Sequence, residues 1–310
     1  FSDKDRLYVS GYYGKDVFVY NSAKNNTKVK IPWGNATATV RYNHLFSDKL
    51  FMNMSFIFND YQFSFTGEQL DFGFKANSGV RDYNVKVDFD YYLNTKHKLK
   101  IGAQYTHHRM TPTQATLRTG DSKFNSTVNK RYSHEVALYI DHEFDVNEKL
   151  KFDFGFRLSL FQHIGPYTNI TGDGYVGQDT TYYGKAKPVK TYVGPEPRMS
   201  MRYAFGKDNS FKAGAGLNYQ YIHLVSSSNS TLPTDIWVQS SQYVKPQMAL
   251  QYSVGYFRNF KNNMFEFSAE AYFKHLWNQI EYAESYVGDL NVDQERGYVF
   301  GKGKAYGLEL

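Results

Sequence analysis

Two carboxylates, Asp88 and Asp90, have the residue type and spacing for joint acid and base chemistry. They lie in a run, residues 84–91, that alternates polar and apolar side chains. Residues two apart on a strand point to the same face and lie about 6 to 7 Å from each other. That separation suits paired carboxylates, but no pocket-forming motif accompanies them. We therefore expect Asp88 and Asp90 to be solvated charges on a polar face.

The sequence contains no clear motif for a metal site or for a cofactor site. His107 and His108 are adjacent, so on a strand they point to opposite faces and cannot jointly ligate one ion. The chain has no cysteine, which excludes thiolate metal sites and disulfides. Gly301, Gly303 and Gly307 have no helix pattern after them, which argues against a phosphate-binding loop. The sequence predicts no enzyme, no metal site and no cofactor.

The net charge of +6 raises the question of nucleic acid. Lysine and arginine are interleaved with acidic residues along the chain, and no basic run or aromatic-basic RNA motif occurs. We therefore do not expect a nucleic-acid partner.

Strict alternation of apolar and polar side chains is the main structural signal. It is clearest in residues 150–160, and it recurs in residues 84–91 and 211–220. No helical period fits these runs, whereas a strand turns successive side chains to opposite faces. The apolar face of the clearest run carries Leu150, Phe152, Phe154, Phe156, Leu158 and Leu160.

Short polar turns divide these runs at roughly every fifty residues, a spacing typical of an up-and-down transmembrane β-barrel. The turns are Ser47-Asp48-Lys49, Asn94-Thr95-Lys96-His97, Asp145-Val146-Asn147-Glu148, Gly206-Lys207-Asp208-Asn209 and Lys261-Asn262-Asn263. Because tight turns recur on one side only, we assign them to the periplasmic end and the longer connections to the extracellular end.

The composition agrees with a barrel in a lipid bilayer. Aromatic residues make up 18% of the chain, yet mean hydropathy is below zero. No run approaches the roughly 20 apolar residues that a membrane helix needs. Half of each barrel strand is polar, which keeps the average hydropathy low. Aromatics gather near strand ends, as at Tyr91-Tyr92, and fit interfacial girdles, although aromatics also fill soluble β-sandwiches.

The predicted fold is all-β, an antiparallel up-and-down transmembrane barrel portion of about twelve strands in one domain, residues 1–310. The strands are expected near 6–18, 35–46, 50–65, 80–93, 98–110, 131–144, 150–163, 197–205, 210–223, 247–260, 264–282 and 301–310. The long connections are expected at 19–34, 66–79, 111–130, 164–196, 224–246 and 283–300.

Several motifs together resemble the barrel of TonB-dependent outer-membrane receptors of the Bacteroidetes type. The clearest lie in the second half of the chain: Gly194-Pro195-Glu196-Pro197-Arg198, Tyr219-Gln220-Tyr221, Leu232-Pro233-Thr234-Asp235-Ile236-Trp237, Lys245-Pro246-Gln247, Glu270-Ala271-Tyr272-Phe273-Lys274 and Ala305-Tyr306-Gly307-Leu308-Glu309. A weaker echo is Asp88-Phe89-Asp90-Tyr91-Tyr92. The likeness covers most of the chain.

The resemblance implies a barrel of about 22 strands closed by a plug, in the outer membrane of a Gram-negative bacterium. It also implies uptake of a scarce nutrient driven by the TonB complex. About half the strands of such a barrel are present, so we expect the chain to be a segment of a longer protein. The lipid bilayer, the TonB complex, an unknown nutrient and a surface lipoprotein are the partners to consider.

Charges on the polar faces should line the interior of such a barrel. They are Lys86, Asp88, Asp90, Glu135, Asp141, Glu143, Lys151, Asp153, Arg157, Arg202, Glu266, Glu270 and Lys274. Some could steer a charged substrate, but we expect most of them to bond to plug residues or water.

Ligand contacts are expected from aromatic and polar residues of the two longest connections, since aromatic faces suit flat or sugar-like ligands. The candidates are Tyr167, Tyr175, Tyr182, Tyr183, Tyr192, Asp235, Trp237 and Tyr243. Two alternatives stay open: these aromatics pack their own loops, or residues 232–237 form a structural latch.

Two other classes of protein also stay open from the sequence. A passive porin would be a closed barrel without a plug, and a soluble or surface-anchored β-protein would turn its apolar faces inward. Iron chelates, cobalamin, glycans and peptides are all carried by receptors that this chain resembles, and its loops do not select among them.

Overall fold

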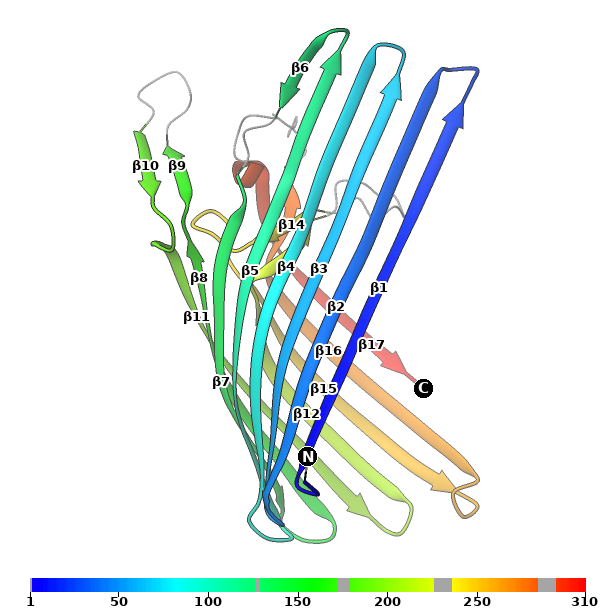
Figure 1. Cartoon of the computed structure of the whole chain (residues 1–310). Coiled ribbons are helices and arrows are strands. Elements are labelled where there is room, and N and C mark those ends of the chain that lie inside the picture. Colours follow the sequence, from blue (N-terminus) through cyan, green and yellow to red (C-terminus); the bar gives the residue numbers. More distant parts are fainter. Residues whose placement is uncertain (1, 126–128, 172–178, 226–235, 284–293) are drawn as a thin grey trace.

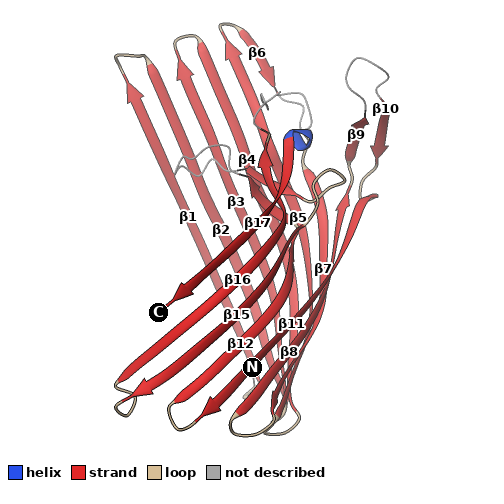
Figure 2. Cartoon of the chain, turned by 180° about the vertical axis from the view of Figure 1, so that it is seen from behind, coloured by secondary structure: helices blue, strands red, loops and turns tan. Residues whose placement is uncertain are grey.

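The alternating segments form one curved antiparallel sheet that wraps about halfway around a central space (Figure 1, Figure 2). The structure, a computed structural model, describes residues 2–125, 129–171, 179–225, 236–283 and 294–310. In this part of the chain, no helix has the length and apolar character required to cross a membrane.

The main sheet follows chain order, with each strand hydrogen-bonded to the next along the path. Its strands are β1 (Asp5–Ser22), β2 (Thr27–Ser47), β3 (Leu50–Gln69), β4 (Phe72–Tyr92), β5 (His97–Thr119), β7 (Arg131–Asp145), β8 (Leu150–Ile164), β11 (Pro188–Phe205), β12 (Asn209–Gln220), β15 (Gln247–Phe260), β16 (Phe265–Tyr282) and β17 (Tyr298–Glu309). These twelve strands correspond one by one to the predicted set, so the predicted up-and-down order is confirmed.

Smaller elements extend this sheet at one end. A short strand, β6 (Ser122–Asn125), pairs with β5. Two separate hairpins follow: β9 (Tyr167–Thr171) with β10 (Asp179–Tyr183), and β13 (Ile222–Val225) with β14 (Ile236–Gln239). A single 3-10 turn, η1 (Gln294–Gly297), precedes β17.

Asparagine builds the short turns at the opposite end. The side-chain oxygen of Asn94 accepts hydrogen bonds from the backbone N–H groups of Lys96 and His97. Asn147 does the same for the turn between β7 and β8. In the last turn, residues 261–263 all have positive φ, a conformation that asparagine tolerates better than most residues. Local turn chemistry thus fixes where each pair of strands reverses.

Three of the predicted long connections are in fact extended hairpins, so their assignment as loops was wrong. Only residues 23–26 separate β1 from β2, and residues 70–71 separate β3 from β4. β5 likewise continues to Thr119. Beyond the bilayer both faces of a strand meet water, so the apolar alternation fades while the backbone ladder continues. The alternation of apolar and polar residues therefore ends several residues before each of these strands ends.

The other predicted connections also contain regular structure. Residues 164–196 hold β9, β10 and the start of β11, and residues 283–300 hold η1 and the start of β17. The predicted strand 210–223 is divided, because β12 ends at Gln220 and β13 belongs to a separate sheet. This break sends the following segment away from the barrel wall.

One face of the sheet carries exposed apolar side chains. On β8, Phe154 and Phe156 are 43% and 45% exposed, and Leu158 and Leu160 are also exposed, whereas Ser159 on the other face is fully buried. Val136, Leu138 and Ile140 continue the same face on β7. A soluble sheet would bury such residues, but on a barrel they face hydrocarbon. The predicted lipid-facing stripe is confirmed.

The opposite face is polar, and its charges pair both along one strand and between neighbouring strands. The Nζ atom of Lys86 lies 3.1 Å from an oxygen of Asp88, and the Nζ atom of Lys98 lies 3.1 Å from one of Glu143. Lys151 reaches the other oxygen of Glu143 at 3.2 Å. The sequence predicts plug residues or water as the partners of most inward charges, whereas in the described part of the chain the sheet itself supplies a partner for each of these.

The outward stripe leads to a stability test. Leu158→Arg places a charge in the middle of the apolar face, and we expect it to cost about 2–4 kcal/mol of folding free energy in a bilayer. Phe124→Arg is the control, because Phe124 is exposed on β6 beyond the bilayer, where the expected cost is about 0–1 kcal/mol. Reversible unfolding in lipid vesicles measures both, and equal costs would contradict the assignment of the stripe to lipid.

Candidate functional site

The longer connections gather at the end of the sheet opposite the short turns. Figures 1 and 2 show β6, the β9–β10 hairpin, the β13–β14 hairpin and η1 around this end. The β9–β10 hairpin projects beyond the neighbouring strands β8 and β11, whereas β13–β14 folds back toward the strands (Figure 1). We refer to this end as the mouth.

The β13–β14 segment crosses the inner side of the sheet. β14 lies against β4 and β5, while β13 lies against β16, which is far away along the sheet. On β14 the Trp237 ring meets Tyr61 edge to face, with 6.3 Å between the ring centroids. Tyr61 belongs to the inner face, since it alternates with the outward Phe56 and Phe58. The segment therefore occupies space inside the curved sheet.

Buried polar contacts hold this segment in place. The Ser133 hydroxyl on β7 donates to the side-chain oxygen of Gln239 at 3.0 Å. The Ser241 hydroxyl donates to a carboxylate oxygen of Glu295 at 2.5 Å, and Arg131 lies 3.9 Å from the other oxygen of Glu295. All five side chains are at least nine-tenths buried. Removing one partner would leave a buried polar group unpaired, which is costly.

An apolar cluster of Val225, Val238, Val244 and Tyr298 accompanies these contacts. Beside it, His223 is fully buried and its Nε2 atom lies 3.0 Å from the Ser240 hydroxyl. Burial lowers the pKa of His223 from 6.5 to about 4, because a charged imidazole would lose its hydration. His223 is therefore neutral near pH 7.

The structure gives three of the predicted ligand residues a supporting contact. The Tyr192 hydroxyl donates to the carbonyl oxygen of Ser241 at 2.7 Å. The Tyr243 hydroxyl donates to the side-chain oxygen of Asn169 at 2.7 Å, which ties the two longest connections together. Tyr167 is buried, with the Arg131 guanidinium 4.3 Å from its ring centroid. Trp237 is the half-buried contact of β14 already described.

Two predicted residues lie on the projecting hairpin. Tyr182 is 70% exposed, and Tyr183 is partly buried against Tyr167, with 6.2 Å between their ring centroids. Tyr167 and Tyr182 line a hollow of about 420 Å³ together with Lys130 and Tyr132. Tyr175 and Asp235 lie outside the described residues. The structure thus brings Tyr167, Tyr182 and Tyr183 together and places Tyr192 and Tyr243 with the inner segment.

A charged network lines the inner face below the mouth. The Nδ1 atom of His108 lies 2.8 Å from Asp82, and its Nε2 atom lies 3.5 Å from Glu135. Arg157 reaches Glu135 at 3.8 Å and Glu196 at 4.0 Å. These contacts connect five consecutive strands of the sheet, from β4 to β11. Asp82, His108 and Glu196 are absent from the predicted set of inward charges. Extending the alternation of each strand to these positions would have placed them on the inner face.

Further along the same face, Arg198 donates from Nε to Asp141 at 2.9 Å, and the Tyr139 hydroxyl donates to Asp88 at 2.5 Å. Asp88 is buried and paired with Tyr139 and Lys86, so the prediction that it is a solvated charge was wrong, because neighbouring side chains of the sheet cover it. Among the residues that the structure describes, no three His, Asp or Glu side chains are grouped so that they could hold a metal ion. The inner face is suited to holding polar groups by charge and hydrogen bonds.

A sequence model described as "TonB dependent receptor-like, beta-barrel" matches residues 2–310. The chain belongs to this family. The resemblance to TonB-dependent receptors inferred from the sequence motifs is confirmed. The assignment to the Bacteroidetes type of these receptors stays a prediction. TonB-dependent receptor barrels reside in the outer membrane of Gram-negative bacteria, and the family consists of receptors and transporters rather than enzymes.

Solved TonB-dependent receptors share the fold. The chain is similar to the ferric preacinetobactin receptor BauA from Acinetobacter baumannii (TM-score 0.61, 10% identity, covering 99% of this chain and 49% of BauA). It is also similar to the ferric-catecholate import receptor Fiu from E. coli K12 (0.58, 13%, 98% and 52%) and to the copper transporter OprC (0.58, 11%, 97% and 49%). The chain therefore spans about half the length of these proteins. A comparison with curated protein sequences found no match.

His223 gives the inner segment of the receptor barrel a pH dependence. A histidine released from the cluster binds a proton below about pH 6.5, whereas the buried one does so only near pH 4. The folded-in position should therefore lose stability as pH falls from about 6.5 toward 4. Fluorescence of Trp237, with Trp33 and Trp277 replaced by Phe, reports this change. His223→Gln should reduce the pH dependence, because glutamine does not titrate.

His134→Gln is the control for this test. His134 lies on the outward face, opposite His107 on β5 and away from the inner segment. Its replacement should leave the fluorescence profile of Trp237 unchanged. An identical pH profile in the native protein and in His223→Gln would show that His223 does not control the segment.

Proposed function

We propose that this chain forms part of the barrel of an outer-membrane receptor that binds a scarce nutrient at its mouth and passes it inward. The energy comes from the TonB complex, which acts on a plug within the barrel. The observation that carries this proposal is the β13–β14 segment, which is folded inside the curved sheet and held by buried polar contacts. A freely permeable porin needs an open interior, whereas a gated receptor needs a mouth that ligand binding can rearrange.

The mouth offers two kinds of residue for this task. Tyr182 and Tyr183 lie on the projecting hairpin beside the hollow and are the proposed ligand contacts. Tyr192, Tyr243 and Trp237 support the inner segment, and a ligand that displaces them moves the segment. Binding outside is coupled to rearrangement inside through the β9–β10 hairpin, because Asn169 on β9 accepts the hydrogen bond of Tyr243.

The charged inner face supports passage of a polar ligand. Glu135 and Glu196 are shared between more than one donor, as expected for a face on which contacts exchange without leaving a charge unpaired. A polar solute can then form hydrogen bonds at successive positions along the interior. This arrangement binds and releases the solute, and no chemical step is required.

Growth of a deletion strain on defined nutrient sources tests the proposal. The panel contains copper and ferric chelates, which the named structural neighbours carry, together with cobalamin, glycans and peptides. We expect growth to fail on one class and to be restored by the native gene only when TonB is functional. Restoration without TonB would indicate a passive pore, and undiminished growth on every class would contradict a role in uptake.

Tyr182 provides a direct test of the ligand site. Tyr182→Ala should weaken binding of the nutrient identified in that panel by about tenfold, equivalent to about 1.4 kcal/mol, because it removes an exposed aromatic face. Tyr92→Ala is the matched control, since Tyr92 is also exposed but ends β4 at the opposite side of the membrane. Isothermal titration of the full-length receptor measures both. Equal affinities for Tyr182→Ala and native protein would remove Tyr182 from the site.

A further inference from the structure

A polar groove lies on the outward face of the sheet, directly above the apolar stripe. On β3, Asp60 follows Phe56 and Phe58 on the same face, and the register pairs Asp60 with Arg81 and Arg81 with Arg109. Asp60 is ten residues beyond Leu50, which lies at the short turn, so the two are about 33 Å apart along the strand. For a strand tilted by about 40°, this distance corresponds to about 25 Å across the membrane. The groove therefore starts where the outer edge of the hydrocarbon is expected.

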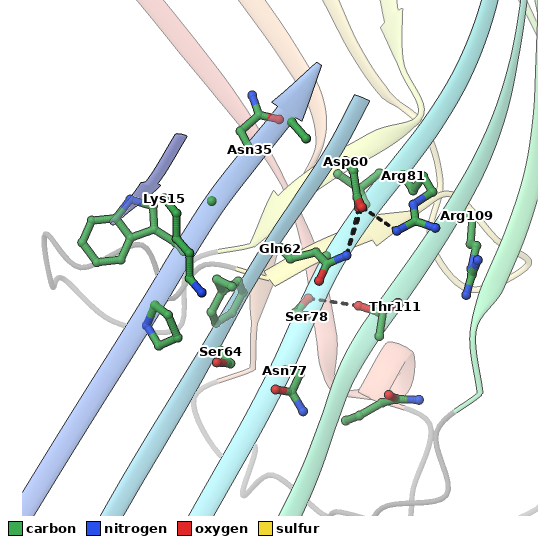
Figure 3. Close-up of a pocket in the computed structure, with 18 of the residues that line it drawn as sticks. Lys15, Asn35, Asp60, Gln62, Ser64, Asn77, Ser78, Arg81, Arg109 and Thr111 are labelled. Carbon is green, nitrogen blue, oxygen red and sulfur yellow. Dashed lines mark hydrogen bonds and ion pairs between the residues drawn. The ribbon is translucent and has the colours of Figure 1, made fainter. Parts of the chain in front are cut away.

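The groove is strongly basic. It has a volume of about 580 Å³, and Figure 3 shows Lys15, Asp60, Arg81 and Arg109 around it. Lys130 completes the charged lining, so four cations face one carboxylate. Cations gathered beside hydrocarbon repel one another unless an anion joins them. The lining thus favours a negatively charged occupant.

Most of these cations have unused hydrogen-bond donors. Arg81 donates from one Nη atom to Asp60 at 2.5 Å, and Gln62 donates to the same carboxylate. The Nε atom of Arg81 is buried and has no hydrogen-bond partner among the described residues. Within that same part of the chain, the side chains of Lys15, Arg109 and Lys130 form no ion pair or hydrogen bond. A guanidinium with free N–H groups is the preferred partner of phosphate oxygens.

Apolar residues continue from the groove toward the membrane. The rings of Phe58 and Tyr83 lie 5.4 Å apart directly below the Asp60–Arg81 pair, and the Arg81 guanidinium lies 5.9 Å from the Phe58 ring centroid. A free anion would contact only the cations of the groove. A lipid contacts both the cations and the aromatic rings, since its headgroup binds the cations and its acyl chains lie along the rings.

We propose that this groove binds the phosphate-bearing headgroup of an outer-leaflet lipid. Arg81 and Arg109 contact the phosphate, Lys15 and Lys130 flank it, and the acyl chains lie on the outward face of β3 and β4. The groove lies on the opposite face of the sheet from the β13–β14 segment, and it shares only Gln114 and Lys130 of its lining with the hollow beside Tyr182. It anchors the long β1–β5 hairpins to the outer leaflet.

Binding of diphosphorylated lipid A to the full-length receptor in detergent, followed by native mass spectrometry, tests the proposal. The groove variant is Lys15→Gln/Arg109→Gln/Lys130→Gln. The control is Lys24→Gln/Arg118→Gln/Lys123→Gln, which removes the same three charges from exposed positions at the hairpin tips. We expect at least roughly a tenfold loss of affinity in the groove variant and less than about a twofold loss in the control, because the attraction between basic residues and an anionic headgroup falls off over a short distance.

Asp60→Asn distinguishes lost binding from lost folding. It removes the one carboxylate of the groove and frees the Arg81 guanidinium, so lipid A should bind more tightly than to the native protein. A misfolded barrel could not produce such a gain. Equal losses in the groove and tip variants, or no gain with Asp60→Asn, would overturn the proposal.

Inorganic phosphate identifies the source of the anion. It should compete with lipid A only at concentrations far above those of the lipid, because it gains nothing from the Phe58 and Tyr83 rings. Competition at comparable concentrations would show a site for free phosphate and would contradict lipid binding. Monophosphorylated lipid A should bind more weakly than the diphosphorylated form, and equal binding would contradict recognition through phosphate.

Discussion

Hydrogen bonding of the backbone in a medium without water is the constraint on which the rest of this structure depends. Inside hydrocarbon each N–H and C=O group must find a protein partner, and a continuous antiparallel ladder provides one for every strand from β2 to β16. Among the residues that the structure describes, β1 and β17 each have one edge without a neighbour in the sheet. In a bilayer these edges require further strands, which agrees with a chain that spans about half the length of the receptors it resembles.

The ladder also determines where chemistry can occur. With the two faces fixed by alternation, apolar side chains meet lipid and charged side chains share the interior with one another. The network through His108, Glu135 and Arg157 shows how cross-strand register turns isolated charges into pairs. The inner segment uses the same solution at the mouth, where Glu295 is held by Ser241 and lies near Arg131. The wall and the inner segment are thus held by the same kind of contact.

The sequence predicted the membrane-spanning parts of the fold because lipid imposes a strict period of two, as in residues 150–160. It did not predict that residues 66–79 continue as strands, since water on both faces removes that period. The site was harder to predict. Tyr192 and Tyr243 have the residue type of ligand contacts, yet their partners, Ser241 and Asn169, are distant in the chain and are set by how the connections fold back. Sequence alternation assigns a face, but only the tertiary arrangement assigns a partner.

The most direct measurement of this account uses the absence of cysteine from the chain. Single cysteines placed one at a time from residue 152 to residue 160 carry a nitroxide in the full-length receptor in vesicles, with any cysteine outside these 310 residues replaced by serine. Collision with oxygen, which concentrates in lipid, should be high at even positions and low at odd positions, and a water-soluble nickel chelate should show the weaker, opposite alternation. Uniform accessibility along β8, or high oxygen collision at the odd positions, would contradict a sheet with lipid on one face and a polar interior on the other.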